Sequence, residues 1–314
     1  MNDAQYKDKN SMSLPHPEKS FIKCTVQEVL QKCNLPFDRL PFDENFYNRC
    51  KEMLDSKYHL PSSIGPYLYV GASIASTAYS HLPEDNRVHV AIYTTLVSAL
   101  DDNSHKRMEG FNHRFVKGLP QDDPILDALA KHLLDAHEYY GQIQCNLIVT
   151  STLDFVTSLM MDIDMTNVAC SPSFAAYCRS ISGVQVAYTM FMFPKSIEFT
   201  SYIHCLPHIS IYINYLNDVL SFYKEELRGE EENFASMLAK ESLITKQEAI
   251  QRLADDVVEA ERNISKGLAG NQSALDIWQS FKVGFVRFHT SCHRYKLQEL
   301  FELPLTSWEI QKMG

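Results

Sequence analysis

The sequence predicts an all-α fold, and three observations lead to this prediction. Over most of the 314 residues, apolar side chains recur every three or four positions, which places them on one face of a helix. Val, Ile and Thr nowhere alternate with polar residues over the length of a strand, and hairpin turns of the Asn-Gly type are missing. No internal repeat is visible. We therefore expect about ten helices in a single domain.

Prolines separate the helices expected in the first half of the chain. The first helical pattern ends before Pro36, Pro41 precedes the second, and Pro61 precedes a segment rich in small and aromatic residues. The expected helices cover residues 21–32, 44–56, 67–79 and 86–100. Residues 1–20 are expected to form a flexible tail, and residues 21–314 a single α-helical domain.

Local start and stop signals define the helices expected in the second half. Asp123 precedes Pro124, so a carboxylate can cap a helix whose first position is proline. Ser171 and Pro172 repeat this arrangement, and Gly141 interrupts the long pattern between the two starts. The expected helices cover 124–161 with a break near Gly141, 172–193, a long apolar helix that includes 209–223, then, after a charged loop at 228–233, 245–268 and 273–300.

The composition excludes several classes of protein. The net charge is −10 and no dense run of Lys and Arg occurs, so nucleic acid is not an expected partner. Eight scattered cysteines without a C-x-x-C pair predict reduced thiols, and therefore a cytoplasmic protein. Residues 1–17 are polar, unlike a signal peptide. No uninterrupted apolar run approaches the roughly 20 residues needed to cross a bilayer, so no membrane span is expected.

A polar column is expected on the long apolar helix. Asn217, Ser221 and Glu225 are spaced i, i+4 and i+8, so their side chains share one helix face. We call these three residues the oxygen column. An amide oxygen, a hydroxyl and a carboxylate suit a hard cation such as Mg²⁺ and suit zinc poorly. Lys224 lies close to the same face, where it could meet an anion held by that cation.

Two adjacent carboxylates form a second candidate site. Asp101 and Asp102 end an apolar helix, and such neighbours repel each other unless a cation neutralises them. By itself the pair is better explained as a solvated helix end. Val97 and Tyr93, one and two turns earlier, would place an apolar and aromatic wall beneath the carboxylates. Together with the oxygen column, the pair predicts two oxygen-rich walls facing one cavity.

These motifs resemble those of the class I terpene cyclases. The segment from Asp101 to His105 is similar to their aspartate-rich motif, and Asn217-Asp218-x-x-Ser221-x-x-x-Glu225 matches their second metal motif at every specified position. Within these enzymes the chain most resembles the trichodiene synthase-like family, through the sequence N-D-x-x-S-F-Y-K-E, the R-x-x-x-G from Arg179 to Gly183, and His293-Arg294-Tyr295. The resemblance spans roughly residues 67–300. It implies the single-domain helical bundle of the class I terpenoid synthases, which encloses a central apolar cavity.

The resemblance implies a metal-bound substrate. In the family, three Mg²⁺ ions hold an isoprenoid diphosphate. Asp101 would bridge two of these ions, and the oxygen column would chelate the third. For Asp102 we expect an indirect role, through an ion pair with an arginine. His105 stands where the family usually has an acidic residue, so this position either retunes metal binding or marks an inactive site.

The resemblance also assigns residues to the diphosphate and to the cavity. The groups expected to hydrogen-bond the diphosphate and support its departure are Arg179, Lys224, Arg294 and Tyr295. The residues expected to line the cavity are Tyr93, Val97, Phe155, Ser182 and Gly183. Ser182 and Gly183 would form a helix break that senses the substrate beside Arg179. Aromatic faces would exclude water and stabilise a carbocation by about 1–2 kcal/mol per contact, although each aromatic residue could equally belong to an ordinary core.

The function implied is that of a Mg²⁺-dependent sesquiterpene synthase. Such an enzyme ionises farnesyl diphosphate, cyclises the carbocation to a terpene hydrocarbon or alcohol, and releases diphosphate. One alternative is a synthase that makes a linear or monocyclic alcohol or uses geranyl diphosphate. Another is a catalytically inactive helical protein that binds prenyl diphosphates. The resemblance leaves a homodimer open.

Other polar patterns have plainer explanations. Asp255 and Asp256 lie on a polar helix and are expected on a solvated face, and Asp162 is expected near a helix end. His204 and His208 are spaced i, i+4 like a metal-binding pair, but no third ligand accompanies them. We expect these residues to be structural.

Overall fold

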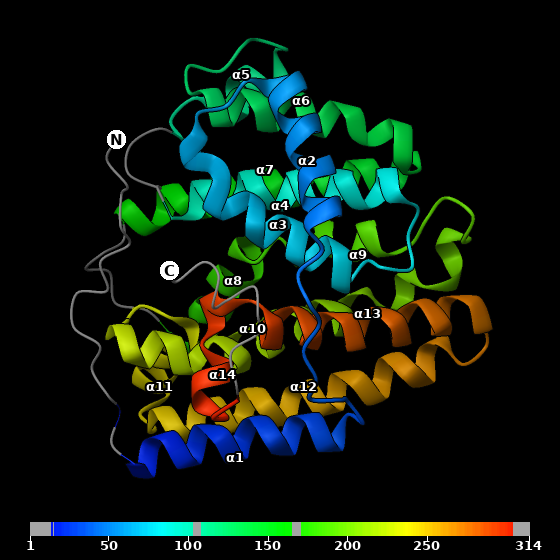
Figure 1. Ribbon diagram of the computed structural model, residues 1–314. Coiled ribbons are helices and arrows are strands. Elements are labelled where there is room, and N and C mark those ends of the chain that lie inside the picture. The colour runs from blue at the N-terminus through cyan, green and yellow to red at the C-terminus, as the bar shows by residue number, and fades with distance from the viewer. Residues whose placement is uncertain (1–13, 15, 103–107, 165–170, 304–314) are drawn as a thin grey trace.

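The structure is a bundle of α-helices (Figure 1). The computed structural model describes residues 14, 16–102, 108–164 and 171–303, and these residues contain no β-strand. The all-α prediction is therefore confirmed. The α-helices are α1 (His16–Lys32), α2 (Glu44–Tyr58), α3 (Gly65–Thr77), α4 (Glu84–Asp101), α5 (Phe111–Val116), α6 (Pro124–Tyr139), α7 (Gln142–Asp164), α8 (Pro172–Ser182), α9 (Gln185–Met192), α10 (Leu206–Arg228), α11 (Phe234–Ser242), α12 (Lys246–Leu268), α13 (Gln272–Ser291) and α14 (Leu297–Leu300). Short 3₁₀ turns are η1 (Ser62–Ile64), η2 (Phe199–Ser201), η3 (Ile203–Cys205) and η4 (His293–Tyr295).

Capping side chains explain where several helices begin. The Asp123 carboxylate accepts hydrogen bonds from the backbone N–H groups of Ile125 and Leu126, just ahead of α6. Ser171 caps α8 in the same way. Thr245 and Glu248 form a reciprocal capping box at the start of α12. Such caps satisfy backbone N–H groups that have no partner within the helix. All three helix starts agree with the predicted ones.

The structure corrects the predicted helices in several places. The helix predicted over residues 172–193 is divided into α8 and α9, because the chain turns at Val184, which has a left-handed φ of 43°. Helix α1 begins at His16 rather than at residue 21, because a proline in the first turn costs no helical hydrogen bond. The short helices α5 and α11 were not predicted. The helix predicted over residues 273–300 ends at Ser291, because Cys292 is extended and Lys296 adopts a left-handed φ of 54°. This break turns η4 back toward α10, with which it is in contact.

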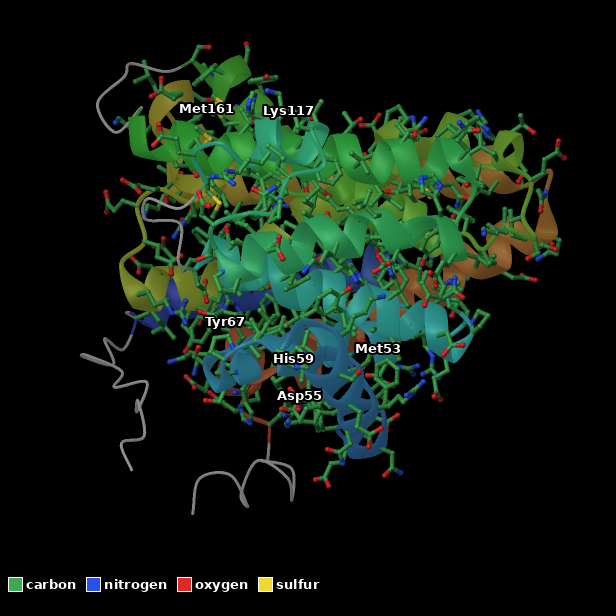
Figure 2. All side chains as sticks on the ribbon, turned by 90° about the horizontal axis from the view of Figure 1, so that it is seen from above. Met53, Asp55, His59, Tyr67, Lys117 and Met161 are labelled. Atoms are coloured by element: carbon green, nitrogen blue, oxygen red, sulfur yellow. The ribbon has the colours of Figure 1, made fainter. Side chains whose placement is uncertain are left out.

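The helices that carry the site are packed closely. Helix α3 packs along α4, and α10 packs against α12 and α9. Gly71 lets α3 approach α4, since a Cβ there would overlap the Ala91 carbonyl oxygen. Viewed from above (Figure 2), Met53 and Asp55 of α2 and the adjoining His59 lie on the same side as Tyr67 of α3. Helix α2 therefore covers the outer face of α3 and α4.

Helix α7 is an exception to the expectation that no segment is long and apolar enough to cross a membrane. Its window Gln142–Asp162 is long and apolar enough to cross a bilayer by length and composition, and no other helix of the described residues passes that test. Half of the window is buried inside the molecule, where α7 contacts α6, α8 and α9. A core helix in a globular bundle has these properties.

Candidate active site

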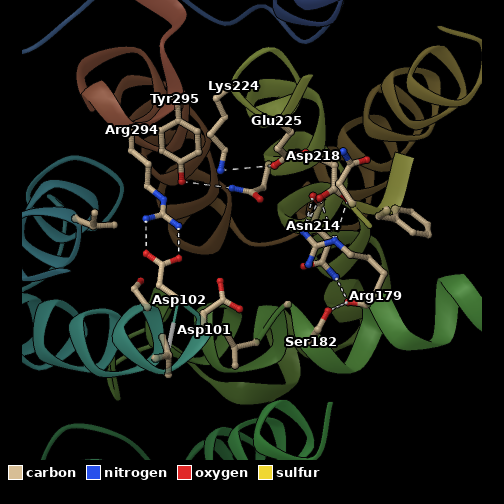
Figure 3. Close-up of a pocket in the computed structure, with 18 of the residues that line it drawn as sticks. Asp101, Asp102, Arg179, Ser182, Asn214, Asp218, Lys224, Glu225, Arg294 and Tyr295 are labelled. Atoms are coloured by element: carbon tan, nitrogen blue, oxygen red, sulfur yellow. Dashed lines mark hydrogen bonds and ion pairs between the residues drawn. The ribbon is translucent and has the colours of Figure 1, made fainter. Parts of the chain in front are cut away.

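A cavity of about 890 Å³ lies between α4, α8, α10 and η4 (Figure 3). This volume is in the range of small-molecule sites, about 300–1,000 Å³. Its polar part holds the carboxylates, amides and cationic side chains described below. Its apolar and aromatic part is lined by Val70, Ile74, Val97, Phe155, Tyr188, Ile213, Phe285 and Phe288.

The oxygen column lies on α10, as predicted. Asn217 and Glu225 line the cavity, and Ser221 is buried beside them. The Ser221 hydroxyl donates a hydrogen bond of 2.5 Å to Glu225 Oε1, which brings the hydroxyl and the carboxylate together. Burial raises the pKa of Glu225, while the nearby Lys224 opposes that rise. The column therefore presents oxygen ligands in a place where an unneutralised carboxylate is disfavoured.

Asn217 is held by a histidine that sequence reasoning missed. The Asn217 amide Nδ2 lies 3.1 Å from His289 Nε2 and donates a longer hydrogen bond, 3.5 Å, to the Tyr295 hydroxyl. His289 lies on α13 with no exposed surface, and burial lowers its pKa to about 3. No spacing rule links residues 217 and 289, so only the structure could bring them together.

The two carboxylates of α4 have different roles. Asp102 forms a two-pronged ion pair with Arg294, with both N–O distances 3.0 Å, as expected for its indirect role. Asp101 faces the cavity, where solvent reaches it although protein surrounds it on most sides. Its pKa is raised by burial and by repulsion from Asp102, against the attraction of Arg294 and other cations. Asp101 is therefore the carboxylate of α4 that gains most from a cation.

Arg179 is anchored by the second residue of the α10 motif. Its Nε lies 3.0 and 2.9 Å from the two carboxylate oxygens of Asp218. Its Nη2 donates a hydrogen bond of 3.2 Å to the backbone carbonyl oxygen of Asn214. The helix break after Ser182 follows, with Val184 at a φ of 43°. Sequence reasoning gave no role to Asp218 or Asn214, whose partners come from another helix.

Gly183 lies tightly against this arginine cluster. A Cβ at Gly183 would overlap Asn214 Oδ1 and lie 2.7 Å from Arg179 Nη1. The Asn214 side-chain oxygen, Oδ1, is buried and has no hydrogen-bond partner among the described residues. Ser182 and Gly183 line the cavity, in agreement with the prediction.

Lys224 and Tyr295 lie together on the other side of the oxygen column. The Lys224 ammonium is 3.6 Å from Glu225 Oε1 and 5.3 Å from the centre of the Tyr295 ring. Burial lowers the pKa of Lys224, and Glu225 opposes this. Burial raises the pKa of the Tyr295 hydroxyl, which therefore keeps its proton. Both side chains face the cavity beside Arg294, as expected.

Tyr93 does not line the cavity, contrary to the prediction. Its hydroxyl is hydrogen-bonded to Thr152 of α7 at 2.8 Å, and its ring packs edge-on against Tyr188 at 6.0 Å. Helix α4 thus turns Tyr93 toward α7, and Tyr188 takes the place at the cavity wall. The Tyr188 hydroxyl donates to Thr94 at 3.2 Å. Val97 and Phe155 do line the cavity, as predicted.

The remaining predicted residues lie away from the cavity or outside the described part of the chain. His105 is outside the described residues. His204 Nε2 lies 3.1 Å from the Gly267 carbonyl, which accounts for it structurally. Asp162 was expected to be a structural residue near a helix end, but its pKa is raised by burial and by the charges of Asp101 and Glu232. In the described part of the chain, no three His, Cys, Asp or Glu residues cluster as a metal site.

The cavity fits a hard cation paired with a polyanion. The oxygen column and Asp101 supply only oxygen donors, which suit Mg²⁺. Four cationic side chains line the cavity with them, namely Arg179, Lys224, Arg228 and Arg294. A lone cation would be repelled by these side chains, and a lone anion by the carboxylates. The two together satisfy both sets of charges.

Comparison with known proteins points in the same direction. The family model described as trichodiene synthase (TRI5) matches residues 60–308. Alpha-cuprenene synthase COP6 of Coprinopsis cinerea is 30% identical over 292 residues, which cover 89% of this chain and 90% of that protein.

Two solved structures share the fold. Linalool/nerolidol synthase of Streptomyces clavuligerus superposes with a TM-score of 0.63 at 14% identity, covering 82% of this chain and 96% of the other. Isoprene synthase from grey poplar, in complex with three Mg²⁺ ions and dimethylallyl-S-thiolodiphosphate, gives a TM-score of 0.54 at 17% identity, covering 86% and 54%. At these identities the structural likeness shows the fold alone.

Proposed function

This chain belongs to the trichodiene synthase family and is a class I terpene cyclase, a lyase that acts on prenyl diphosphates, and we propose that it is a Mg²⁺-dependent sesquiterpene synthase whose substrate is farnesyl diphosphate. One observation carries the proposal. The oxygen column, Asp101 and four cationic side chains lie at the polar part of a cavity that also has an apolar and aromatic part. The charged residues 230–232 line the polar part as well. A diphosphate fits the charged end, and an isoprenoid chain fits the rest.

The oxygen donors are divided between two walls. The oxygen column on α10 and Asp101 on α4 would hold Mg²⁺, and we expect three ions in all. When bound, Mg²⁺ neutralises the charge that develops on a departing diphosphate.

The side chains of the protein bind the diphosphate and keep it oriented. Arg179 and Arg294 would add charge-assisted hydrogen bonds while Asp218 and Asp102 hold their guanidinium groups in place. Lys224 would place a further positive charge beside the oxygen column. These fixed donors need little rearrangement when charge develops on the leaving group.

The apolar part of the cavity protects the carbocation. Three phenylalanine rings line it, those of Phe155, Phe285 and Phe288. These rings carry no oxygen or nitrogen atom that could react with the carbocation. Their ring faces would stabilise the cation by about 1–2 kcal/mol each. Water exclusion then favours cyclisation over quenching.

Product analysis tests the proposal. Purified protein with Mg²⁺ should convert farnesyl diphosphate to a C15 hydrocarbon or alcohol detected by gas chromatography. Geranyl diphosphate should be converted less efficiently, as measured by kcat/KM. A higher kcat/KM for geranyl diphosphate would replace the proposed substrate. Folded protein that converts neither would support the inactive alternative raised by His105.

The response to pH provides a second test. Burial raises the pKa of Asp101 and Glu225, so each takes up a proton at a higher pH than an ordinary carboxylate, whose pKa is about 4. In metal-free protein these two groups therefore favour folding more as the pH falls. Mg²⁺ must displace these protons, so we expect its affinity in the presence of diphosphate to weaken from pH 8 to pH 5.5.

Thermal unfolding at several Mg²⁺ concentrations measures this coupling. Glu225→Gln cannot take up a proton at that position, so part of the pH dependence should be lost in this variant. A pH dependence of the half-saturating Mg²⁺ concentration that is the same in Glu225→Gln as in the wild type would show that Glu225 does not exchange a proton for the metal.

We also propose a cytoplasmic location. Six cysteines are free thiols, namely Cys24, Cys33, Cys50, Cys145, Cys205 and Cys292. Free thiols are typical of reducing compartments.

A further inference from the structure

The oxygen and the NH₂ group of the Asn217 amide have nearly the same shape, but the oxygen accepts hydrogen bonds and the NH₂ group donates them. The oxygen can bind a cation, whereas the NH₂ group, a donor with no lone pair to offer, cannot. A rotation of the amide by half a turn would therefore replace a metal ligand with a repulsive group. The inference that follows rests on the proposed function, in which Asn217 Oδ1 binds Mg²⁺. It concerns what keeps that oxygen in place.

A chain of hydrogen bonds from α13 determines the orientation. His289 Nδ1 lies 2.7 Å from the Phe285 carbonyl oxygen. A carbonyl only accepts hydrogen bonds, so Nδ1 carries the hydrogen, and in a neutral ring Nε2 is then the acceptor. Nε2 lies 3.1 Å from the Asn217 amide, and only the NH₂ end can donate to it. The Asn217 oxygen must therefore face away from His289.

The imidazole itself is well fixed. His289 has no exposed surface and lies against three aromatic rings, with ring centres 4.6 Å from Phe285, 4.9 Å from Phe288 and 4.2 Å from Tyr295. These contacts prevent the ring from turning over. The Tyr295 hydroxyl is the other acceptor for the Asn217 NH₂ group, at the longer distance of 3.5 Å. His289 therefore makes the shorter of the two contacts that orient the amide.

We propose that His289 is a positioning residue, which holds the Asn217 amide so that its oxygen and not its NH₂ group faces the metal and the diphosphate. It acts through Asn217 and touches neither ligand. Partners of this kind behind a metal ligand typically change metal affinity by about 10–100-fold when they are replaced. The role depends on one acceptor atom, which gives it a specific test.

The test measures binding of Mg²⁺ with inorganic diphosphate, without turnover. The half-saturating Mg²⁺ concentration is obtained by calorimetry and from the shift in the unfolding temperature. His289→Phe keeps an aromatic ring and removes the acceptor, so we expect a rise of about 10–100-fold. His289→Gln places an amide oxygen near the position of Nε2 and should recover most of the affinity. As a matched control, His204→Phe replaces a histidine that contacts the Gly267 carbonyl and should bind as the wild type does.

A double variant separates orientation from general disturbance. Asn217→Asp presents an oxygen at both ends, so it has no wrong orientation for His289 to prevent. In the Asn217→Asp background, His289→Phe should therefore change the half-saturating concentration by no more than about twofold, the usual error of additivity. Should His289→Phe fail to fold, His289→Leu, which also lacks the acceptor, takes its place in both backgrounds.

The outcomes decide between the proposals. Wild-type affinity in His289→Phe would overturn the positioning role, as would an equal loss in His289→Phe and His289→Gln. A loss that persists undiminished in the Asn217→Asp background would also overturn it. A wild-type protein that binds diphosphate without any need for Mg²⁺ would instead contradict the proposed function.

Discussion

Replacing Asn217 with leucine is expected to abolish measurable turnover of farnesyl diphosphate while the protein stays folded. Leucine is similar in size but offers no oxygen, so the metal site on α10 loses one of its three ligands. If this loss removes about 4 kcal/mol of stabilisation from the transition state, kcat/KM falls by about 10³-fold. His289 Nε2 would also lose its hydrogen-bond partner, at a cost of about 1–3 kcal/mol to folding. The measurement is kcat/KM, together with the thermal unfolding temperature.

A matched variant on another helix controls for the change in side-chain chemistry. Asn48 is exposed on α2 and lies away from the cavity, so Asn48→Leu should retain wild-type kcat/KM. Full activity in Asn217→Leu would refute the assignment of Asn217 as a metal ligand. An inactive Asn217→Leu that still binds Mg²⁺ and diphosphate as tightly as the wild type would refute it as well.

Adding a single methyl group at Gly183 is expected to lower kcat/KM by about 10²-fold, the effect of misplacing catalytic groups by about 1 Å. Gly183 has a φ of −82°, which alanine adopts readily, so the effect does not come from backbone strain. The new Cβ would overlap Asn214 Oδ1 and press on the Arg179 guanidinium group. Both groups would have to shift, and overpacking of this kind costs about 1–3 kcal/mol.

The control for Gly183→Ala is an alanine where space is open. Gly65 also has helical backbone angles, and a Cβ there meets nothing within 4 Å. Gly65→Ala should therefore keep wild-type kcat/KM. If Gly183→Ala were as active as Gly65→Ala, the positions of Arg179 and Asn214 would not matter for the reaction.

Much of the site could be predicted because its signals are local. The oxygen column follows from the i, i+4, i+8 spacing on one helix, and it lies on α10 as that spacing requires. The caps at Asp123 and Ser171 depend only on the next few residues, and both helix starts agree with the structure. An ion pair of Asp102 with an arginine was expected, but only the structure identifies Arg294, 192 positions away, as its partner.

The parts that could not be predicted depend on contacts between distant helices. Helical spacing placed Tyr93 on an apolar face, but it could not decide whether that face met the cavity or α7. His289 and Asn214 are buried polar residues whose partners lie 72 and 35 positions away, and no local pattern marks them. The break at Cys292 was missed because the apolar spacing continues through it.

The most direct test of the central claim is a crystal structure of the protein with Mn²⁺ and inorganic diphosphate, with the ions located by anomalous scattering. Mn²⁺ takes oxygen ligands as Mg²⁺ does and can be seen at its own absorption edge. We predict one Mn²⁺ bound by Asn217 Oδ1, Ser221 Oγ and Glu225, and further Mn²⁺ on Asp101, with the diphosphate between the two walls. Ions that bind the diphosphate without contacting the oxygen column or Asp101, or a cavity that takes up neither ion nor diphosphate, would contradict the account.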